Sequence, residues 1–120
     1  MARYDVIVRL RTGWPVSASG LVHLRQVGRQ LPGRCRLRGI LVFTEGYIEL
    51  TIRMQSPGHL EAIDQARLLL PRFGFPRHAL RRVEIYRPHP LPSHRALLAC
   101  WHPRTNPTKP VPPSGTRAAA

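Results

Sequence analysis

Acidic side chains are scarce in this sequence. The 120 residues include six aspartates and glutamates against 19 lysines and arginines, so the formal net charge at pH 7 is +13 and the pI is about 11.7. So few carboxylates argue against a nuclease that depends on metal ions held by clustered acidic ligands. A chain this basic usually meets a polyanion, which means nucleic acid, an anionic membrane surface or an acidic protein.

Lysine is almost absent as well, because eighteen arginines accompany a single lysine, Lys109. Arginine presents a planar, permanently charged fork that matches the geometry of phosphates and carboxylates. A GC-rich coding sequence would also favour arginine, proline, alanine and glycine without any selection for binding. The composition therefore leaves two explanations for the charge, a functional one and a compositional one.

Cysteines and long apolar runs are also few. Cys35 and Cys100 are far apart in the sequence and form no CxxC pair. A disulfide between them is possible, but no other feature indicates a secreted domain held by disulfides. No apolar run approaches the roughly 18 residues that a membrane span needs. The first residues, Met1 to Asp5, lack the apolar core of a signal peptide. We expect a soluble, cytoplasmic protein with no membrane partner.

Alternating and helical hydrophobic patterns follow one another in the order β-α-β-β-α-β. The strand patterns cover residues 3–10, 34–43, 47–54 and 82–87. One helix pattern opens at Ser17 or Ser19, and the other opens at Ser56 and Pro57. A tight turn at residues 44–46 joins the second strand to the third.

This order of elements predicts an α/β fold (an α+β sandwich) of ferredoxin-like topology. Right-handed crossovers give a four-stranded antiparallel sheet in the spatial order 4-1-3-2, with two helices on one face. We expect this domain to span residues 1–87. Residues 88–102 form an extension in which 96–101 has the composition of a short docked helix, and residues 103–120 read as a disordered, basic, proline-rich tail.

Three arginines, Arg34, Arg36 and Arg38, alternate along the second predicted strand. Alternate residues point to the same side of a sheet, so these side chains would line the face away from the helices. The same face is predicted to carry further cationic and aromatic side chains, namely Arg9, Arg53, Arg82, Tyr47 and Tyr86. Arginines would neutralise phosphates and tyrosines would stack on bases, which predicts a non-enzymatic domain that binds nucleic acid, either RNA or DNA.

Two other interpretations of this face stay open. Asp5, Glu49 and Glu84 are predicted to point the same way, so the face could be a solvated surface whose arginine–carboxylate pairs contribute little. Separately, the face is predicted to expose an apolar patch formed by Ile7, Ile40 and Val42.

Such a patch is unusual on a monomer. It indicates either a homodimer packed face to face or cover by residues 88–101. The second functional hypothesis is therefore a dimeric regulatory or protein-interaction module of ferredoxin-like topology.

Residues suited to catalysis or metal binding are present but not in recognisable arrangements. An enzyme would need a pocket that gathers His59 with Asp5 or Glu49. The extension carries side chains of types that bind zinc, namely His89, His94, Cys100 and His102. Their spacing matches no standard zinc finger. We therefore predict no enzymatic activity, no metal site and no cofactor.

Overall fold

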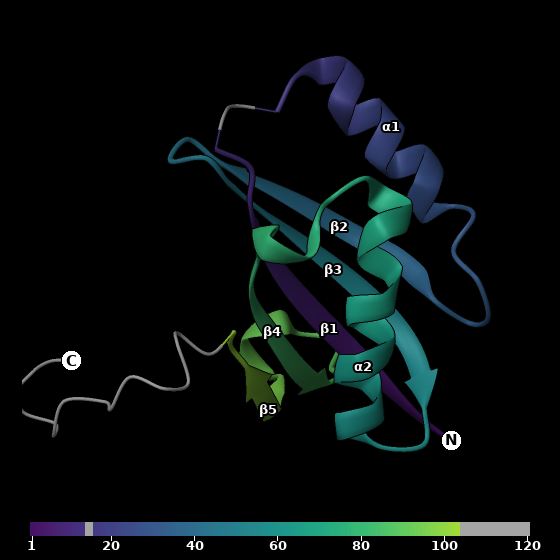
Figure 1. Cartoon of the computed structure of the whole chain (residues 1–120). Coiled ribbons are helices and arrows are strands. Elements are labelled where there is room, and N and C mark those ends of the chain that lie inside the picture. The colour runs from purple at the N-terminus through teal and green to yellow at the C-terminus, as the bar shows by residue number, and fades with distance from the viewer. Residues whose placement is uncertain (14–15, 104–120) are drawn as a thin grey trace, which may run out of the picture.

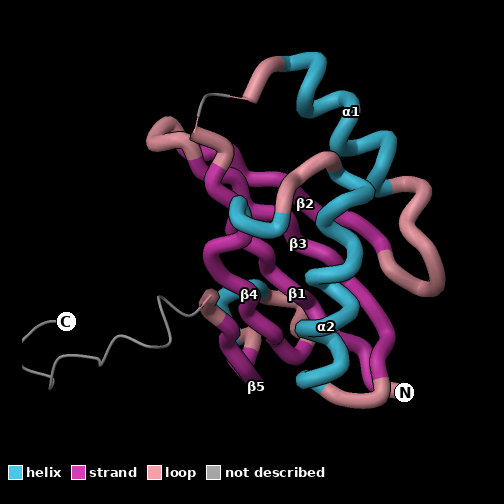
Figure 2. The backbone as a smooth tube through the Cα atoms, in the orientation of Figure 1, coloured by secondary structure: helices cyan, strands magenta, loops and turns pink. Residues whose placement is uncertain are grey.

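A mixed α/β fold is formed by residues 1–13 and 16–103, the part of the chain that the computed structural model describes. It contains two α-helices and a five-stranded antiparallel sheet (Figure 1, Figure 2). The elements are β1 (Ala2–Arg11), α1 (Ala18–Gly28), β2 (Arg36–Phe43), β3 (Tyr47–Ser56), α2 (His59–Leu69), β4 (Leu80–Arg87) and β5 (Ala96–Trp101). Short 3-10 helices cover Leu70–Phe73, Arg77–Ala79 and Pro92–His94.

The described strands lie in the order β2-β3-β1-β4-β5, with every neighbouring pair antiparallel. The central strand β1 pairs with β3 over its whole length, from Ala2 opposite Ser56 to Arg11 opposite Tyr47. Residues directly opposite each other point to the same side of a sheet. The register therefore assigns each side chain either to the face that the helices cover or to the other side, which we name the open face.

The hydrophobic core lies between the sheet and α2, which crosses the sheet in Figure 1. Alternate residues of β1, β3 and β4 are fully buried there, namely Val6, Val8, Leu10, Ile48, Leu50, Ile52, Met54, Val83 and Ile85. α2 contributes Ala62, Ile63, Ala66 and Leu69. The other helix, α1, lies beside β2 at the edge of the sheet and buries Leu24. This alternation explains why the sequence pattern located β1, β3 and β4.

The two helices differ in how they begin. The Ser17 hydroxyl caps α1 by accepting a hydrogen bond from the Gly20 backbone N–H at 3.1 Å. The prediction that α2 opens at Ser56 and Pro57 was wrong, since Ser56 ends β3 and Gly58 precedes α2 without a side-chain cap. Among the described residues, no helix combines the length and the apolarity needed to cross a membrane.

The segment 96–101 is the strand β5 and not the short helix that its composition suggested. It pairs with β4, from Val83 opposite Trp101 to Arg87 opposite Ala96, so the sheet has five strands where the sequence predicted four. Pairing satisfies the outer edge of β4, and the inner side chains Ala99 and Trp101 pack against the core. Tertiary contacts thus outweigh the helix propensity of alanine and leucine. Residues 104–120, nearly all of the predicted tail, lie outside the described residues.

A shift of register in β2 changes which side chains face the core. The shift lies between Leu37 and Gly39, where Arg38 is the extra residue of a β-bulge. Beyond it, Ile40 and Val42 stand opposite the core residues Leu50 and Ile48. The prediction that Ile40 and Val42 point outward was therefore wrong, because one inserted residue inverts the alternation of the strand.

The bulge also moves the alternate side chains of β2, Leu41 and Phe43, to the open face. Leu41 stands opposite Glu49, and Phe43 stands opposite Tyr47, so both lie on the open face. Alternation without the bulge would place Leu41 and Phe43 on the same side as Leu37, toward the core.

Candidate functional site

The carboxylate of Asp5 holds two arginines on the open face. Asp5 is 3 % exposed, and it accepts hydrogen bonds from Arg53 at 2.8 Å (Nε to Oδ1) and 3.2 Å (Nη2 to Oδ2). Arg95 approaches the same carboxylate at 3.6 Å. The hydrogen bond to Asp5 raises the pKa of Arg53. Arg53 therefore lies where the sequence predicted, but its charge is used to compensate a buried carboxylate.

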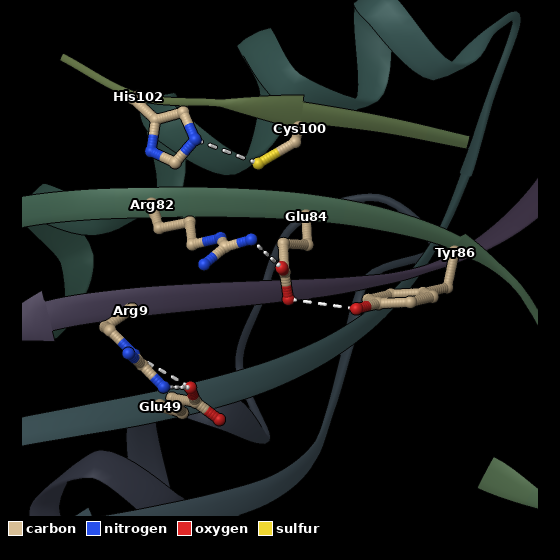
Figure 3. A network of polar contacts seen from close by, with 7 residues as sticks. All are labelled: Arg9, Glu49, Arg82, Glu84, Tyr86, Cys100 and His102. Carbon is tan, nitrogen blue, oxygen red and sulfur yellow. Dashed lines mark hydrogen bonds and ion pairs between the residues drawn. The ribbon is translucent and has the colours of Figure 1, made fainter. Parts of the chain in front are cut away.

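Two more of the arginines predicted for this face, Arg9 and Arg82, are also paired with carboxylates (Figure 3). Arg9 on β1 donates a hydrogen bond from Nε to Glu49 on β3 at 2.9 Å. Arg82 on β4 lies 2.7 Å from Glu84, two residues along the same strand. Arg9 and Arg82 thus each have an anion beside them, which offsets their charge.

The two tyrosines predicted to stack on bases also have intramolecular partners. The Arg11 guanidinium lies over the Tyr47 ring at 5.9 Å, and the Arg95 guanidinium lies over the Tyr86 ring at 5.1 Å. The Tyr86 hydroxyl donates a hydrogen bond to Glu84 at 3.0 Å (Figure 3). Burial, and then this hydrogen bond, raise the pKa of Tyr86. A base would have to share these rings with an arginine, and stacking stays a prediction.

The arginines at the start of β2 form a different kind of surface. Arg34, Arg36 and Arg38 are exposed, and none of them forms an ion pair with another described residue. Together with Arg3 and Arg53 they line a hollow of about 440 Å³. We name Arg34, Arg36 and Arg38 the β2-edge arginines.

The alternation that the sequence predicted for these three arginines is only partly present. Arg36 points to the open face, because it stands opposite Arg53. Arg34 precedes β2 in the turn after Gly33, whose φ is 64°, and Arg38 is the bulge residue. The three side chains are therefore brought to one hollow by a turn, a strand position and a bulge rather than by simple alternation.

The distribution of acidic residues explains why the β2-edge arginines have no carboxylate partner among residues 1–13 and 16–103. Residues 6–44 contain no aspartate and no glutamate, so β2 and α1 carry none. The carboxylates of the sheet come from β1, β3 and β4. Cationic charge at the β2 edge is therefore left to interact with solvent or with a ligand.

Sequence reasoning missed Arg25 and Arg29, which lie at the C-terminal end of α1 and line a second hollow beside β2. Their spacing of four residues places them on one side of a helix, which the sequence could have shown. This side of α1 adjoins the β2-edge arginines because of how the helix packs on the sheet. The local sequence pattern does not predict that packing.

The predicted apolar patch is not assembled. Ile7 lies on the open face opposite Thr51 and Glu84, whereas Ile40 and Val42 lie on the other side of the sheet. A homodimer therefore cannot be built on these three residues together. Dimerisation itself stays a prediction.

The residues considered for catalysis are far from forming one site. His59 begins α2 on the helix-covered side, while Asp5 and Glu49 lie on the open face in ion pairs with Arg53 and Arg9. The absence of enzymatic activity stays a prediction.

The residue types that suit zinc form two separate pairs. The His89 and His94 rings stack with centroids 5.4 Å apart, and Cys100 Sγ lies 3.3 Å from His102 Nε2 (Figure 3). Within residues 1–13 and 16–103, no three histidine, cysteine or acidic side chains come together as metal ligands.

Compared with known proteins, the chain matches no family model, no curated protein and no solved structure. The structure itself shows a distinct arrangement of arginine charge. That arrangement has two parts: on the open face Arg9, Arg53 and Arg82 are paired with carboxylates, whereas at the β2 edge none of the three arginines forms an ion pair with another described residue.

Proposed function

We propose that the protein is a non-enzymatic nucleic-acid-binding domain that contacts the phosphates of RNA or DNA through the β2-edge arginines. The observation that supports this most directly is that Arg34, Arg36 and Arg38 line one hollow and form no ion pair with any described residue. Guanidinium groups bind phosphate through paired hydrogen bonds. The contacts would carry no sequence information, since every nucleotide has a phosphate.

The paired arginines of the open face are less suited to this role. A phosphate that binds Arg53 must compete with Asp5, and displacing Asp5 would leave a buried carboxylate with a poorer partner. The β2-edge arginines have no such competitor. Binding at the β2 edge therefore replaces water and counterions only, which makes the affinity depend steeply on salt.

We also propose that β1 to β4 with α1 and α2 form a ferredoxin-like unit to which β5 has been added. The strand order β2-β3-β1-β4 within the five-stranded sheet supports this assignment. The fold hosts many unrelated functions, so it does not by itself argue for nucleic-acid binding.

Fluorescence anisotropy with labelled single-stranded RNA, single-stranded DNA and duplex DNA tests the proposal. The variant Arg36→Glu with Arg38→Glu should lose binding to all three. A matched control, Arg72→Glu with Arg87→Glu, changes the net charge equally at exposed positions that form no ion pair among the described residues. If both variants bind equally well, the β2-edge arginines are not the binding site.

A dimeric regulatory or protein-interaction module is the second candidate. It is favoured by the position of β2 at the edge of the described sheet, together with Leu41, which is 60 % exposed on the open face. An edge strand with an exposed apolar side chain is a common site for pairing between chains. Analytical ultracentrifugation should show a dimer that Leu41→Asp dissociates; a monomeric parent protein would exclude this candidate.

A further inference from the structure

The helix α1 packs so closely against β2 that the two elements form one surface. Gly28, in the last turn of α1, has no side chain, and a Cβ placed there would lie 2.5 Å from Leu37 Cδ2 of β2. A distance this short is a steric clash for any larger residue. Gly28 thus allows the backbone of α1 to approach the strand directly, which brings the neighbouring side chains of α1 to the β2 edge.

Arg25 and Arg29 flank this contact. Both are exposed, and neither forms an ion pair with another described residue. They line a hollow of about 550 Å³ together with Arg36. The hollow of about 440 Å³ that holds Arg34 and Arg38 is also lined by Arg36. The two hollows therefore meet at Arg36, one toward α1 and the other toward β3.

A simpler role for Arg25 and Arg29 is to offset the dipole of α1, whose C-terminal end carries the partial charges of free carbonyl groups. That partial charge amounts to roughly half an elementary charge. Two arginines supply four times as much charge of the opposite sign, and no carboxylate occurs between residues 6 and 44 to balance the remainder. The helix dipole therefore accounts for only part of the arrangement.

We propose that Arg25 and Arg29 of α1 bind the same phosphate backbone as the β2-edge arginines, and that the ligand of this five-arginine cradle is a single-stranded nucleic acid. This inference rests on the proposed function and adds to it the helix side of the site and the class of ligand. The two hollows share Arg36 and extend from the strand to the neighbouring helix. A flexible single strand can follow such a path, whereas a duplex is stiff over about 150 base pairs.

The experiment compares three double variants that each remove two positive charges: Arg25→Gln with Arg29→Gln, Arg36→Gln with Arg38→Gln, and the control Arg72→Gln with Arg87→Gln. Circular dichroism first verifies that each variant keeps the fold. Anisotropy then gives the affinity for a labelled single-stranded oligonucleotide, and for its duplex, between about 50 and 200 mM salt. The slope of log affinity against log salt reports the number of phosphate contacts.

Each phosphate contact to a single strand contributes about 0.7 to this slope. We expect the α1 variant (Arg25→Gln with Arg29→Gln) and the β2 variant (Arg36→Gln with Arg38→Gln) each to make this negative slope shallower by about 1.4. The control should change the slope by much less. The parent protein should bind the single strand at least tenfold more tightly than the duplex. An α1 variant that behaves like the control, while the β2 variant loses contacts, would overturn the inference and leave the proposed function standing.

Two other outcomes would contradict different parts of the proposal. If the β2 variant also behaves like the control, the proposed function fails together with the inference. If the duplex binds as tightly as the single strand and both variants lose contacts, the site is correct but the assignment to a single strand is wrong.

Discussion

The open face and the β2 edge are both rich in arginine, yet they differ in what surrounds the charge. On the open face Arg9, Arg53 and Arg82 each lie within hydrogen-bonding distance of a carboxylate. At the β2 edge Arg36 and Arg38 have no such partner among the described residues. A count of basic residues therefore overstates the unpaired cationic surface, because carboxylates beside Arg9, Arg53 and Arg82 offset part of the charge of the open face.

The largest expected effect is a loss of folding stability in Arg53→Gln, which we compare with a loss of nucleic-acid affinity in Arg36→Gln. Arg53→Gln removes the main partner of the buried Asp5 carboxylate, and Arg95, at 3.6 Å, compensates only in part. We expect the free energy of unfolding to fall by about 1–3 kcal/mol, with a smaller loss of nucleic-acid affinity than Arg36→Gln causes. Arg36→Gln should have the opposite profile, with a stability change below about 0.5 kcal/mol and weaker binding.

Urea denaturation and anisotropy measure the two quantities on the same samples. The comparison would be contradicted if Arg53→Gln left the stability unchanged, because Asp5 would then not depend on its arginine. It would also be contradicted if Arg36→Gln proved the more destabilising of the two.

The next effect concerns the packing that joins α1 to β2. Gly28→Ala places a methyl group against Leu37, so the helix must move away from the strand. The overpacking outweighs the gain in helix propensity, and we expect a loss of about 1–2 kcal/mol in stability. Binding should weaken severalfold, because the arginines of α1 and β2 would separate. Gly39→Ala is the matched control, since its Cβ would meet no heavy atom within 4 Å.

Thermal unfolding and anisotropy check this prediction. If Gly28→Ala binds nucleic acid as the parent does, while its melting temperature falls, α1 does not take part in the site. A fall in the melting temperature of Gly39→Ala as large as that of Gly28→Ala would show that the packing argument is wrong.

The smallest effect uses the two cysteines as reporters, since one lies in each region. Cys35 lines both hollows at the β2 edge, and Cys100 stands opposite Glu84 on the open face. Burial raises the pKa of Cys35, so less of it is thiolate at pH 7 and alkylation should be slow. Raising the pH increases the thiolate fraction, so the alkylation rate of Cys35 should rise with pH.

Iodoacetamide labelling followed by mass spectrometry gives the rate at each cysteine. Saturating oligonucleotide should slow the labelling of Cys35 by several-fold and leave Cys100 unchanged. Protection of Cys100 with no change at Cys35 would place the nucleic acid on the open face instead.

The fold was predictable where residues alternate without interruption. The patterns of β1, β3 and β4 gave the strands and their buried sides, and the turn at 44–46 contains Gly46 with a φ of 89°. The sequence also limited the cap of α1 to Ser17 or Ser19, and the structure shows Ser17 in that role. These features depend on neighbours in sequence, which is why the sequence alone was enough.

The remaining features depend on contacts between distant residues. The bulge at Arg38 inverts the outer half of β2, and nothing in the local alternation required it. The helix-forming composition of 96–101 yields to pairing with the free edge of β4. The position of Arg25 and Arg29 follows from the close approach at Gly28. The residue types of the candidate site could thus be predicted from the sequence, but its location and extent could not.

The most direct test compares the salt dependence of single-strand binding for two double variants, Arg36→Gln with Arg38→Gln and Arg9→Gln with Arg82→Gln. Both remove two arginines, the first pair from the β2 edge and the second from the ion pairs of the open face. The first variant should make the negative slope of log affinity against log salt shallower by about 1.4, and the second should barely change it. Equal losses, or a larger loss for the second variant, would contradict the account.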